Sequence, residues 1–186
     1  INSALRRVPG VYVRPEDGYG NFPNISLRGI DMGRSSKVTI MEDGILAAPA
    51  PYSAPSAYYS PNMERMSGLE VIKGSSQVKY GPHTTGGAIN YLSTQIPEDV
   101  TTYSRIYYGE FDEMVSHIYH GGKKDTDSGR IGYLVECYYR NTDGFKELQG
   151  ANGETGFTRS EPMLKLSWEP NTSNYQSLEL KLGSTD

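Results

Sequence analysis

The second half of the chain alternates apolar and polar residues with a period of two, and this pattern constrains the fold more than any other feature. Leu178, Leu180 and Leu182 fall on one side of a strand, and Glu179 and Lys181 fall on the other. Successive side chains of a β-strand point to opposite faces, so this period predicts strands rather than helices. We expect five such strands, over Tyr103–Gly109, Met114–Gly122, Arg130–Asn141, Met163–Glu169 and Tyr175–Gly183.

Two kinds of sheet share this period. The predicted strands are about as long as a tilted strand that crosses a bilayer, roughly 9–11 residues, and Tyr or Trp near their ends suits an aromatic girdle. The connections alternate between the short segments Lys123–Gly129 and Pro170–Asn174 and the long segment Thr142–Pro162, as in outer-membrane barrels. A soluble sheet with one wet face has the same alternation. On the alternation alone, the soluble sheet is favoured because it is the commoner solution.

Two stretches, Gly44–Met63 and Tyr80–Pro97, carry no Asp, Glu, Lys or Arg and are each near the length of a membrane-spanning helix. Proline and glycine interrupt both of them, so neither can hold a continuous helix. Across the chain, 21 Gly and 11 Pro make 32 of 186 residues. That share also argues against a helical bundle.

The first half is predicted to be a compact α+β domain with a small mixed sheet and many loops. Its composition changes near Pro97, which we take as a boundary between domains over 1–97 and 98–186. We expect a short helix at Ser3–Arg7 and a helical turn at Pro61–Met66 that is capped by Ser60. The expected strands are Val11–Arg14, Ile25–Arg28, Val38–Met41, Leu69–Ile72 and Ala88–Ser93.

Several functions are disfavoured by composition and spacing. The net charge of −4 argues against a nucleic-acid partner. The single Cys137 excludes a disulfide within the chain and a cysteine metal cage. His117 and His120 lie three apart on a predicted strand and therefore point to opposite faces, so they cannot share one metal ion. The segment Asp125–Gly129 is interpreted as a hairpin turn rather than a calcium loop. No nucleophile with its base is apparent, so we do not expect an enzyme.

Five strings in the first half carry a more specific signal. They are LRRVPGVYV, ISLRGID, VTIMEDGI, MSGLEVIKGSSQVKYGP and TTGGAINYLST, which span Leu5–Val13, Ile25–Asp31, Val38–Ile45, Met66–Pro82 and Thr84–Thr94. Their order and spacing resemble the plug domain of TonB-dependent outer-membrane receptors over residues 1–97. Residues 98–186 then look like the first antiparallel strands of the 22-stranded transmembrane β-barrel of such a receptor. The run Asp43–Pro61 is most similar to ferric-citrate-type receptors.

The resemblance implies a function and a set of partners. Such receptors lie in the outer membrane of Gram-negative cells, bind a ferric chelate and import it with energy supplied through TonB. The ferric chelate would be the transported ligand, and no covalently bound cofactor is expected. The short segment with which TonB pairs and the remaining barrel strands are not among these residues, so we expect the chain to be a piece of a longer receptor in contact with outer-membrane lipid. Another cargo (a different siderophore, cobalamin, a metal complex or a sugar) and a soluble α+β binding module remain alternatives.

The resemblance assigns two roles to Arg28, which lies in the string Leu-Arg-Gly. It would either help to hold an anionic chelate or pair with barrel glutamates that lock the plug to the barrel, and a guanidinium suits both partners. Lys73 stands where many family members carry an arginine of the same lock. A lysine keeps the charge but loses the fork of donors.

Two loops, Asp17–Pro23 and Ala50–Ser60, correspond to plug loops that face the extracellular ligand. The expected ligand-binding residues in and beside them, with lumen packing as the alternative for each, are Arg14, Tyr19, Tyr52, Tyr58 and Tyr59. Ala54 and Ser56 stand at two ligand-facing positions where the ferric-citrate pattern has polar amides. That departure leaves open whether citrate is the ligand, but it does not change the class of receptor.

Overall fold

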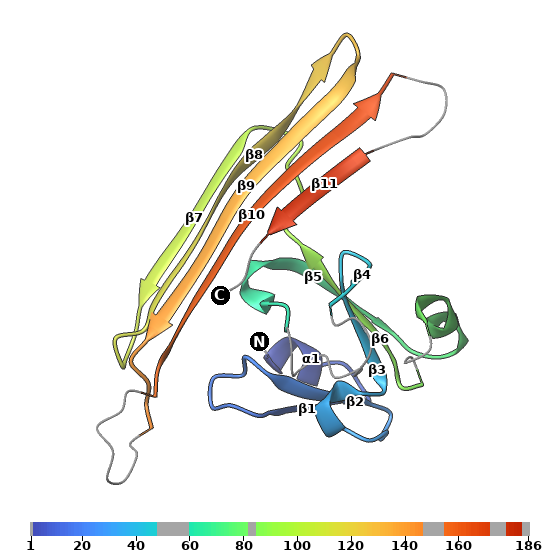
Figure 1. Ribbon diagram of the computed structural model, residues 1–186, viewed down its shortest axis with the longest axis vertical. Helices are drawn as coiled ribbons and strands as arrows, with labels where there is room; N and C mark the ends of the chain where they lie inside the picture. Colours follow the sequence, from blue (N-terminus) through green and yellow to red (C-terminus); the bar gives the residue numbers. More distant parts are fainter. Residues whose placement is uncertain (1, 48–59, 82–84, 147–154, 172–177, 184–186) are drawn as a thin grey trace. The chain divides into compact units, whose positions relative to one another are not determined.

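The computed structural model describes residues 2–47, 60–81, 85–146, 155–171 and 178–183. The chain divides into two compact units, Ile1–Thr94 and Gln95–Asp186, which are described separately (Figure 1). In the described ranges, no helix has both the length and the apolar character to cross a membrane.

The first unit holds two small sheets and little helix. Its elements are α1 (Asn2–Arg6), β1 (Val11–Pro15), β2 (Pro23–Leu27), η1 (Gly33–Ser35), β3 (Val38–Glu42), β4 (Ile45–Leu46), η3 (Met63–Arg65), β5 (Met66–Ile72), η4 (Ser75–Tyr80) and β6 (Gly87–Ser93). The strands β1 and β2 form an antiparallel pair. The other four form a mixed sheet in the order β4-β3-β6-β5, in which β3 and β6 run parallel.

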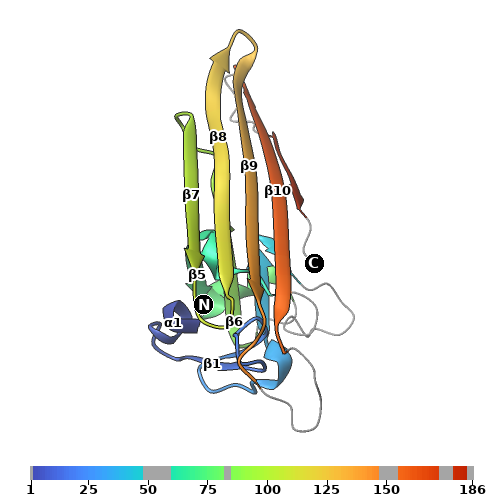
Figure 2. The same ribbon diagram turned by 90° about the vertical axis from the view of Figure 1, so that its left-hand side faces the viewer.

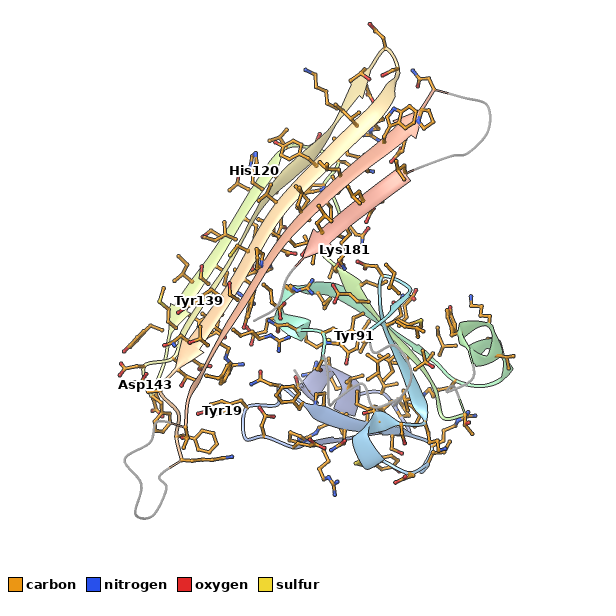
Figure 3. All side chains as sticks on the ribbon, in the orientation of Figure 1. Tyr19, Tyr91, His120, Tyr139, Asp143 and Lys181 are labelled. Atoms are coloured by element: carbon orange, nitrogen blue, oxygen red, sulfur yellow. The ribbon has the colours of Figure 1, made fainter. Side chains whose placement is uncertain are left out.

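One apolar core joins these elements. Leu5 of α1, Ile25 and Leu27 of β2 and Ile89 of β6 are fully buried and pack in the same cluster. Removing this aliphatic surface from water supplies the main driving force for folding of the unit. Tyr91 extends the core on β6 (labelled in Figure 3), and burial raises the pKa of its hydroxyl. The predicted helix and five predicted strands of this half are confirmed to within a few residues.

The helical turn near residue 62 differs from the prediction in its cap. The turn is the 3₁₀ helix η3, and the residue before it is Asn62, whose side-chain oxygen accepts a hydrogen bond from the backbone N–H of Glu64 at 3.1 Å. Ser60 therefore does not cap it. An asparagine satisfies an unpaired N–H of the first turn as well as a serine does, and Asn62 is the residue directly before η3.

The second unit is a single antiparallel sheet of five long strands, ordered as they occur in the sequence (Figures 1 and 2). The strands are β7 (Thr101–Tyr108), β8 (Met114–Thr126), β9 (Gly129–Thr142), β10 (Phe157–Pro170) and β11 (Leu178–Gly183). Four of the five predicted strands are confirmed, and the fifth, Tyr175–Gly183, is confirmed over Leu178–Gly183, since residues 175–177 lie outside the described residues. The hairpin turn predicted within Asp125–Gly129 is also confirmed, and it is tighter than expected, because Thr126 already pairs with Gly129.

The predicted loop Thr142–Pro162 is wrong at its C-terminal end, where β10 already begins at Phe157. Arg159 pairs with Arg140 of β9, and Glu161 pairs with Tyr138. The sequence hides this part of the strand because it places polar residues on both faces, and Pro162 adds a signal that usually ends a strand.

Candidate functional site

Arg28 and Lys73, the two predicted lock residues, meet at one turn of the first unit. The turn is Pro9-Gly10, between α1 and β1. The backbone N–H of Arg28 donates to the carbonyl oxygen of Gly10 at 2.8 Å, and the ammonium of Lys73 donates to the carbonyl oxygen of Pro9 at 2.7 Å. The guanidinium of Arg28 donates to the carbonyl oxygen of Gly86 at 3.4 Å. Residues that are far apart in the sequence therefore converge on one short segment.

Arg28 is held in an uncommon conformation. Its φ angle is 58°, in the left-handed region that non-glycine residues seldom adopt. Both Arg28 and Lys73 are exposed, and among the described residues neither lies within ion-pair distance of a carboxylate. A guanidinium has five N–H donors, so Arg28 retains donors for an anion while it contacts Gly86.

The predicted apical loop around Tyr19 is organised by its own hydrogen bonds. The Asp17 carboxylate accepts the backbone N–H groups of Asn21 at 3.1 Å and of Phe22 at 3.4 Å. The Glu16 backbone N–H donates to the Phe22 carbonyl at 2.9 Å, which closes the loop at its base. Local bonds of an aspartate to the backbone ahead of it are a common way to fix a tight loop. Tyr19 (Figure 3) is half-buried within this loop.

Arg14 and Arg28 lie at opposite ends of the β1–β2 pair. Arg14 is exposed and pairs with Asn24 beside the loop, whereas Arg28 follows the pair of Val11 with Leu27. The structure thus separates these two predicted ligand-binding arginines along the hairpin. The other predicted ligand-binding positions lie outside the described residues: Tyr52, Ala54, Ser56, Tyr58 and Tyr59.

The five-stranded sheet has two chemically opposite faces, which its register defines. The charged face carries Arg105, His117, Glu136, Arg140, Arg159, Glu161, Lys165 and Lys181. The apolar face carries Ile106, Ile118, Ile131, Tyr133, Val135, Cys137, Tyr139, Leu164, Leu166, Trp168, Leu178, Leu180 and Leu182. In Figure 3, His120 and Tyr139 lie on one side of the sheet and Lys181 lies on the other.

The burial of charged and aliphatic side chains on the two faces is reversed from that in a water-soluble sheet, although the charged face also buries Val115, Leu134, Tyr138 and Met163. On the charged face, Lys165 is 0% exposed and Glu136 is 1% exposed. On the apolar face, Val135 is 54% exposed and Leu178 is 64% exposed. Lys and Glu are almost never fully buried in water-soluble proteins unless they are paired. An exposed apolar surface of this extent marks an interaction site or contact with lipid.

Ionisable side chains on the charged face lie in close pairs. His117 Nε2 lies 2.8 Å from Glu136 Oε1, and Arg140 lies 2.5 Å from Glu113. Arg159 pairs with Glu161, which lies two residues further along β10 on the same face. Buried charges need such partners, since an unpaired charge away from water is costly.

The prediction for the two histidines is confirmed. His117 contacts Glu136 on the charged face, and His120 contacts the hydroxyl groups of Thr102 at 2.8 Å and Tyr133 at 2.9 Å on the apolar face. They cannot bind one ion together. Over the described part of the chain, no three His, Cys, Asp or Glu side chains gather as a metal site would need.

Sequence reasoning missed a polar network at the end of the mixed sheet. Arg65 and Glu42 form a buried ion pair at 2.8 Å. The Asp43 carboxylate accepts the backbone N–H of Ser93 at 2.9 Å, and Gly44 donates its N–H to the Asn90 side chain at 2.8 Å. The signal was the acidic pair directly after an apolar strand.

A second charged cluster in the sheet unit joins Glu98, before β7, to Lys123 of β8 and Arg130 of β9. Glu98 lies 2.9 Å from Lys123 and 2.6 Å from Arg130. The hydrogen bond from Lys123, reinforced by the charge of Arg130, lowers the pKa of the Glu98 carboxyl. This cluster connects the segment before β7 to the base of β8 and β9.

Comparison with known proteins agrees with this arrangement. Residues 1–88 match the family model described as the TonB-dependent receptor plug domain. Among solved structures, the chain is similar to the ferric citrate transporter FecA in its unliganded form, with 17% identity and a TM-score of 0.57. It is also similar to the pyoverdine outer membrane receptor FpvA from Pseudomonas aeruginosa PAO1, with 18% identity and a TM-score of 0.71, and to the siderophore receptor PirA from Acinetobacter baumannii, with 19% and 0.66.

These matches take in almost all of this chain but only part of each relative. They cover 98% of the chain for FecA and FpvA and 100% for PirA. The chain in turn spans 38%, 24% and 29% of the length of those three structures. At these identities the likeness shows the fold, and the family model adds the domain. Over residues 1–88 the chain is therefore similar to the plug domain of TonB-dependent receptors.

Proposed function

We propose that this chain is the plug domain and the first wall strands of a Gram-negative outer-membrane receptor that imports a ferric chelate with energy supplied through TonB. The plug-family match over residues 1–88 supports the receptor class. The strands β7 to β11 would be the beginning of a transmembrane barrel, with the boundary near residue 97. In this proposal the protein is a transporter and not an enzyme.

The reversed burial of the five-stranded sheet is the observation that carries the membrane placement. Its apolar face runs along β9 from Ile131 to Tyr139, close to the roughly 9–11 residues of a tilted membrane strand. Trp168 and Tyr139 lie near opposite ends of that band, where outer-membrane barrels carry aromatic girdles. A soluble sheet would bury this face and expose the charged one, so the observation favours the membrane over the soluble alternative.

Cys137 is a native probe of that placement, since it lies exposed on the apolar face of β9, between Val135 and Tyr139. We expect it to resist a water-soluble maleimide when the full-length receptor is in its native membrane and to react after solubilisation in urea. Thiolate is the reactive form, and lipid excludes both thiolate and reagent. Ser128→Cys, in the exposed turn between β8 and β9, should react in both states. Labelling of Cys137 in the intact membrane at the rate of that control would contradict the placement.

For the cargo, we propose an anionic ferric chelate of the ferric dicitrate type, with Arg28 as one of its ligands. The support is the exposed guanidinium, its spare donors and the absence of an ion-pair partner for it among the described residues. The competing role for Arg28 is a lock, together with Lys73, onto carboxylates of the receptor wall. Both roles use the same guanidinium chemistry, so binding and stability must be measured on the same variant.

The test is ligand binding by the full-length receptor in detergent, with ferric dicitrate, iron-free citrate and a panel of other chelates. If Arg28 holds the anion, Arg28→Ala weakens ferric dicitrate binding roughly tenfold or more, since a charged hydrogen bond is worth about 1.5–3 kcal/mol. Arg7→Ala removes an equal charge from an exposed position and should leave the affinity unchanged. If Arg28 is the lock, affinity stays and the melting temperature falls.

Another member of the panel is the alternative cargo. Tight binding of a different siderophore, of cobalamin, of another metal complex or of a sugar, with no binding of ferric dicitrate, would keep the receptor class and change the ligand. Ala54 and Ser56 are then the first positions to substitute with amides. The remaining expected contacts, Arg14, Tyr19, Tyr52, Tyr58 and Tyr59, are proposals of the same kind, and each can be scored in this panel.

A further inference from the structure

The apolar face of the five-stranded sheet contains a groove near the tight turn between β8 and β9. Its volume is about 540 Å³. Its lining includes Val100, Gly122, Ile131, Tyr133 and Leu166, together with Lys124. The apolar members are between 38% and 68% exposed, so the groove opens outward from the sheet. The strands that form it, β8, β9 and β10, are hydrogen-bonded neighbours.

The groove exists because one row of the sheet lacks a side chain. Gly122 of β8 pairs with Tyr133 of β9, which pairs in turn with Leu166 of β10. The Tyr133 hydroxyl bonds to His120 at 2.9 Å, which holds the tyrosine toward the next row rather than over the glycine. A Cβ atom at Gly122 would lie 2.9 Å from Val100 Cα, so the backbone approach of Val100 also requires glycine there.

Two lysines line this groove, Lys123 and Lys124, and only Lys124 belongs to the apolar face. Lys124 lies in the adjacent row with Ile131 and Trp168. By the register, Lys124 is the one Lys, Arg, Asp or Glu on the apolar face of the described strands β7 to β11. It is exposed, and within the described ranges it has no ion-pair partner, whereas its neighbour Lys123 pairs with Glu98 on the charged face.

We propose that this groove binds one anionic glycerophospholipid, with an acyl chain against Gly122 and Leu166 and the phosphate at Lys124. Lysine and tryptophan are the side chains that occupy the membrane–water interface, the former with its stem along apolar surface and its charge in the headgroup region. The isolated positive charge beside an apolar groove is complementary to an anionic lipid rather than to a soluble anion or an uncharged lipid. The tight turn that begins at Asp127 places the site in the leaflet on the short-turn side.

This inference rests on the proposed membrane placement of the sheet. Its test measures which lipid the purified receptor retains. The full-length receptor is purified in mild detergent and analysed by native mass spectrometry with phosphatidylglycerol and phosphatidylethanolamine of equal acyl chains. One lysine near the headgroups supports roughly a fivefold preference for the anionic lipid. We expect Lys124→Gln to abolish that preference. Leu166→Trp, which fills the groove from its open side, should lower the retention of both lipids.

Lys146→Gln is the matched control, because Lys146 is an exposed lysine of the same unit in the connection between β9 and β10, away from the groove. A wild-type receptor without preference, or a preference that survives Lys124→Gln or is lost equally in Lys146→Gln, would overturn the lipid site. Failure of the membrane placement has a separate readout, the labelling of Cys137 in the intact membrane. Protection of Cys137 without lipid preference therefore rejects only this inference.

Discussion

At the scale of single residues, the Pro9-Gly10 turn is where distant parts of the plug meet. Lys73 contributes one hydrogen bond to it, at 2.7 Å from the Pro9 carbonyl. Because the bond is exposed, we expect Lys73→Met to destabilise the turn by only about 0.5–1.5 kcal/mol. Amide hydrogen exchange of the full-length receptor measures this. The Arg28 amide, which donates to Gly10, should exchange about two- to tenfold faster.

Lys37→Met is the control for that substitution, since Lys37 is also exposed in the first unit. It should leave exchange at Arg28 unchanged. Unchanged exchange in Lys73→Met as well would mean that the ammonium does not hold the turn in solution. The proposed lock of Lys73 onto the receptor wall would then have to be tested without this contact.

Single residues also show which features of the site could be predicted from the sequence. The string around Arg28 identified the residue, and the spacing of His117 and His120 gave their opposite faces. Neither signal could give the partners of Arg28 and Lys73, which are backbone carbonyls of Gly86 and Pro9. Every residue has a carbonyl, so no residue type marks such an acceptor in advance.

At the scale of elements, the pair of Arg65 and Glu42 connects η3 to the end of β3. Arg65 is 3% exposed and lies 2.8 Å from Glu42. Removing one partner of a buried pair leaves an uncompensated charge, so Arg65→Met should cost about 3–5 kcal/mol. The measurement is amide exchange across β3 and β6, whose protection reports the stability of the mixed sheet.

The double variant separates charge from packing. Arg65→Met combined with Glu42→Leu removes both charges and should recover much of the lost stability, because replacing a buried pair with apolar residues is often neutral. Glu64→Gln, on the partly exposed neighbour of Arg65, is a control with little expected effect. If the single and double variants lost equal stability, the shape of Arg65 would matter more than its charge.

Elements were predicted best where one face was apolar and worst where both were polar. β11 and the C-terminal part of β10 carry leucines at alternate positions, and the sequence located them. The first residues of β10 carry Arg159 and Glu161 on one face and Thr158 and Ser160 on the other. Alternation between two polar sets leaves no hydrophobic period to detect. The ion pair between Arg159 and Glu161 joins two residues on the same face of β10, and hydrophobic periodicity does not indicate such a pair.

At the scale of the whole molecule, the period of two predicted a sheet but did not indicate whether its apolar face contacts protein or lipid. The same alternation describes a soluble sheet and a membrane wall, and the two differ only in which face is buried. That information appears only in the burial, since Lys165 is 0% exposed and its neighbour Leu166 is 44% exposed. The plug, by contrast, was identified from five short strings, because its loops and turns require particular residues at fixed positions.

Whether the apolar face contacts water or lipid can be decided by placing an arginine at two different depths. Val135 lies midway along the apolar face of β9 and is 54% exposed. If that face contacts lipid, Val135→Arg costs about 2–4 kcal/mol in the full-length receptor folded into phospholipid bilayers, and Thr126→Arg, near the strand end, costs about 0–1 kcal/mol. On a wet surface both changes stay within about 0.5 kcal/mol. Urea titration of each variant, extrapolated to zero urea, measures the difference. Equal and small effects at the two positions would mean that this face contacts water. They would also contradict the proposal that this chain is part of a transporter.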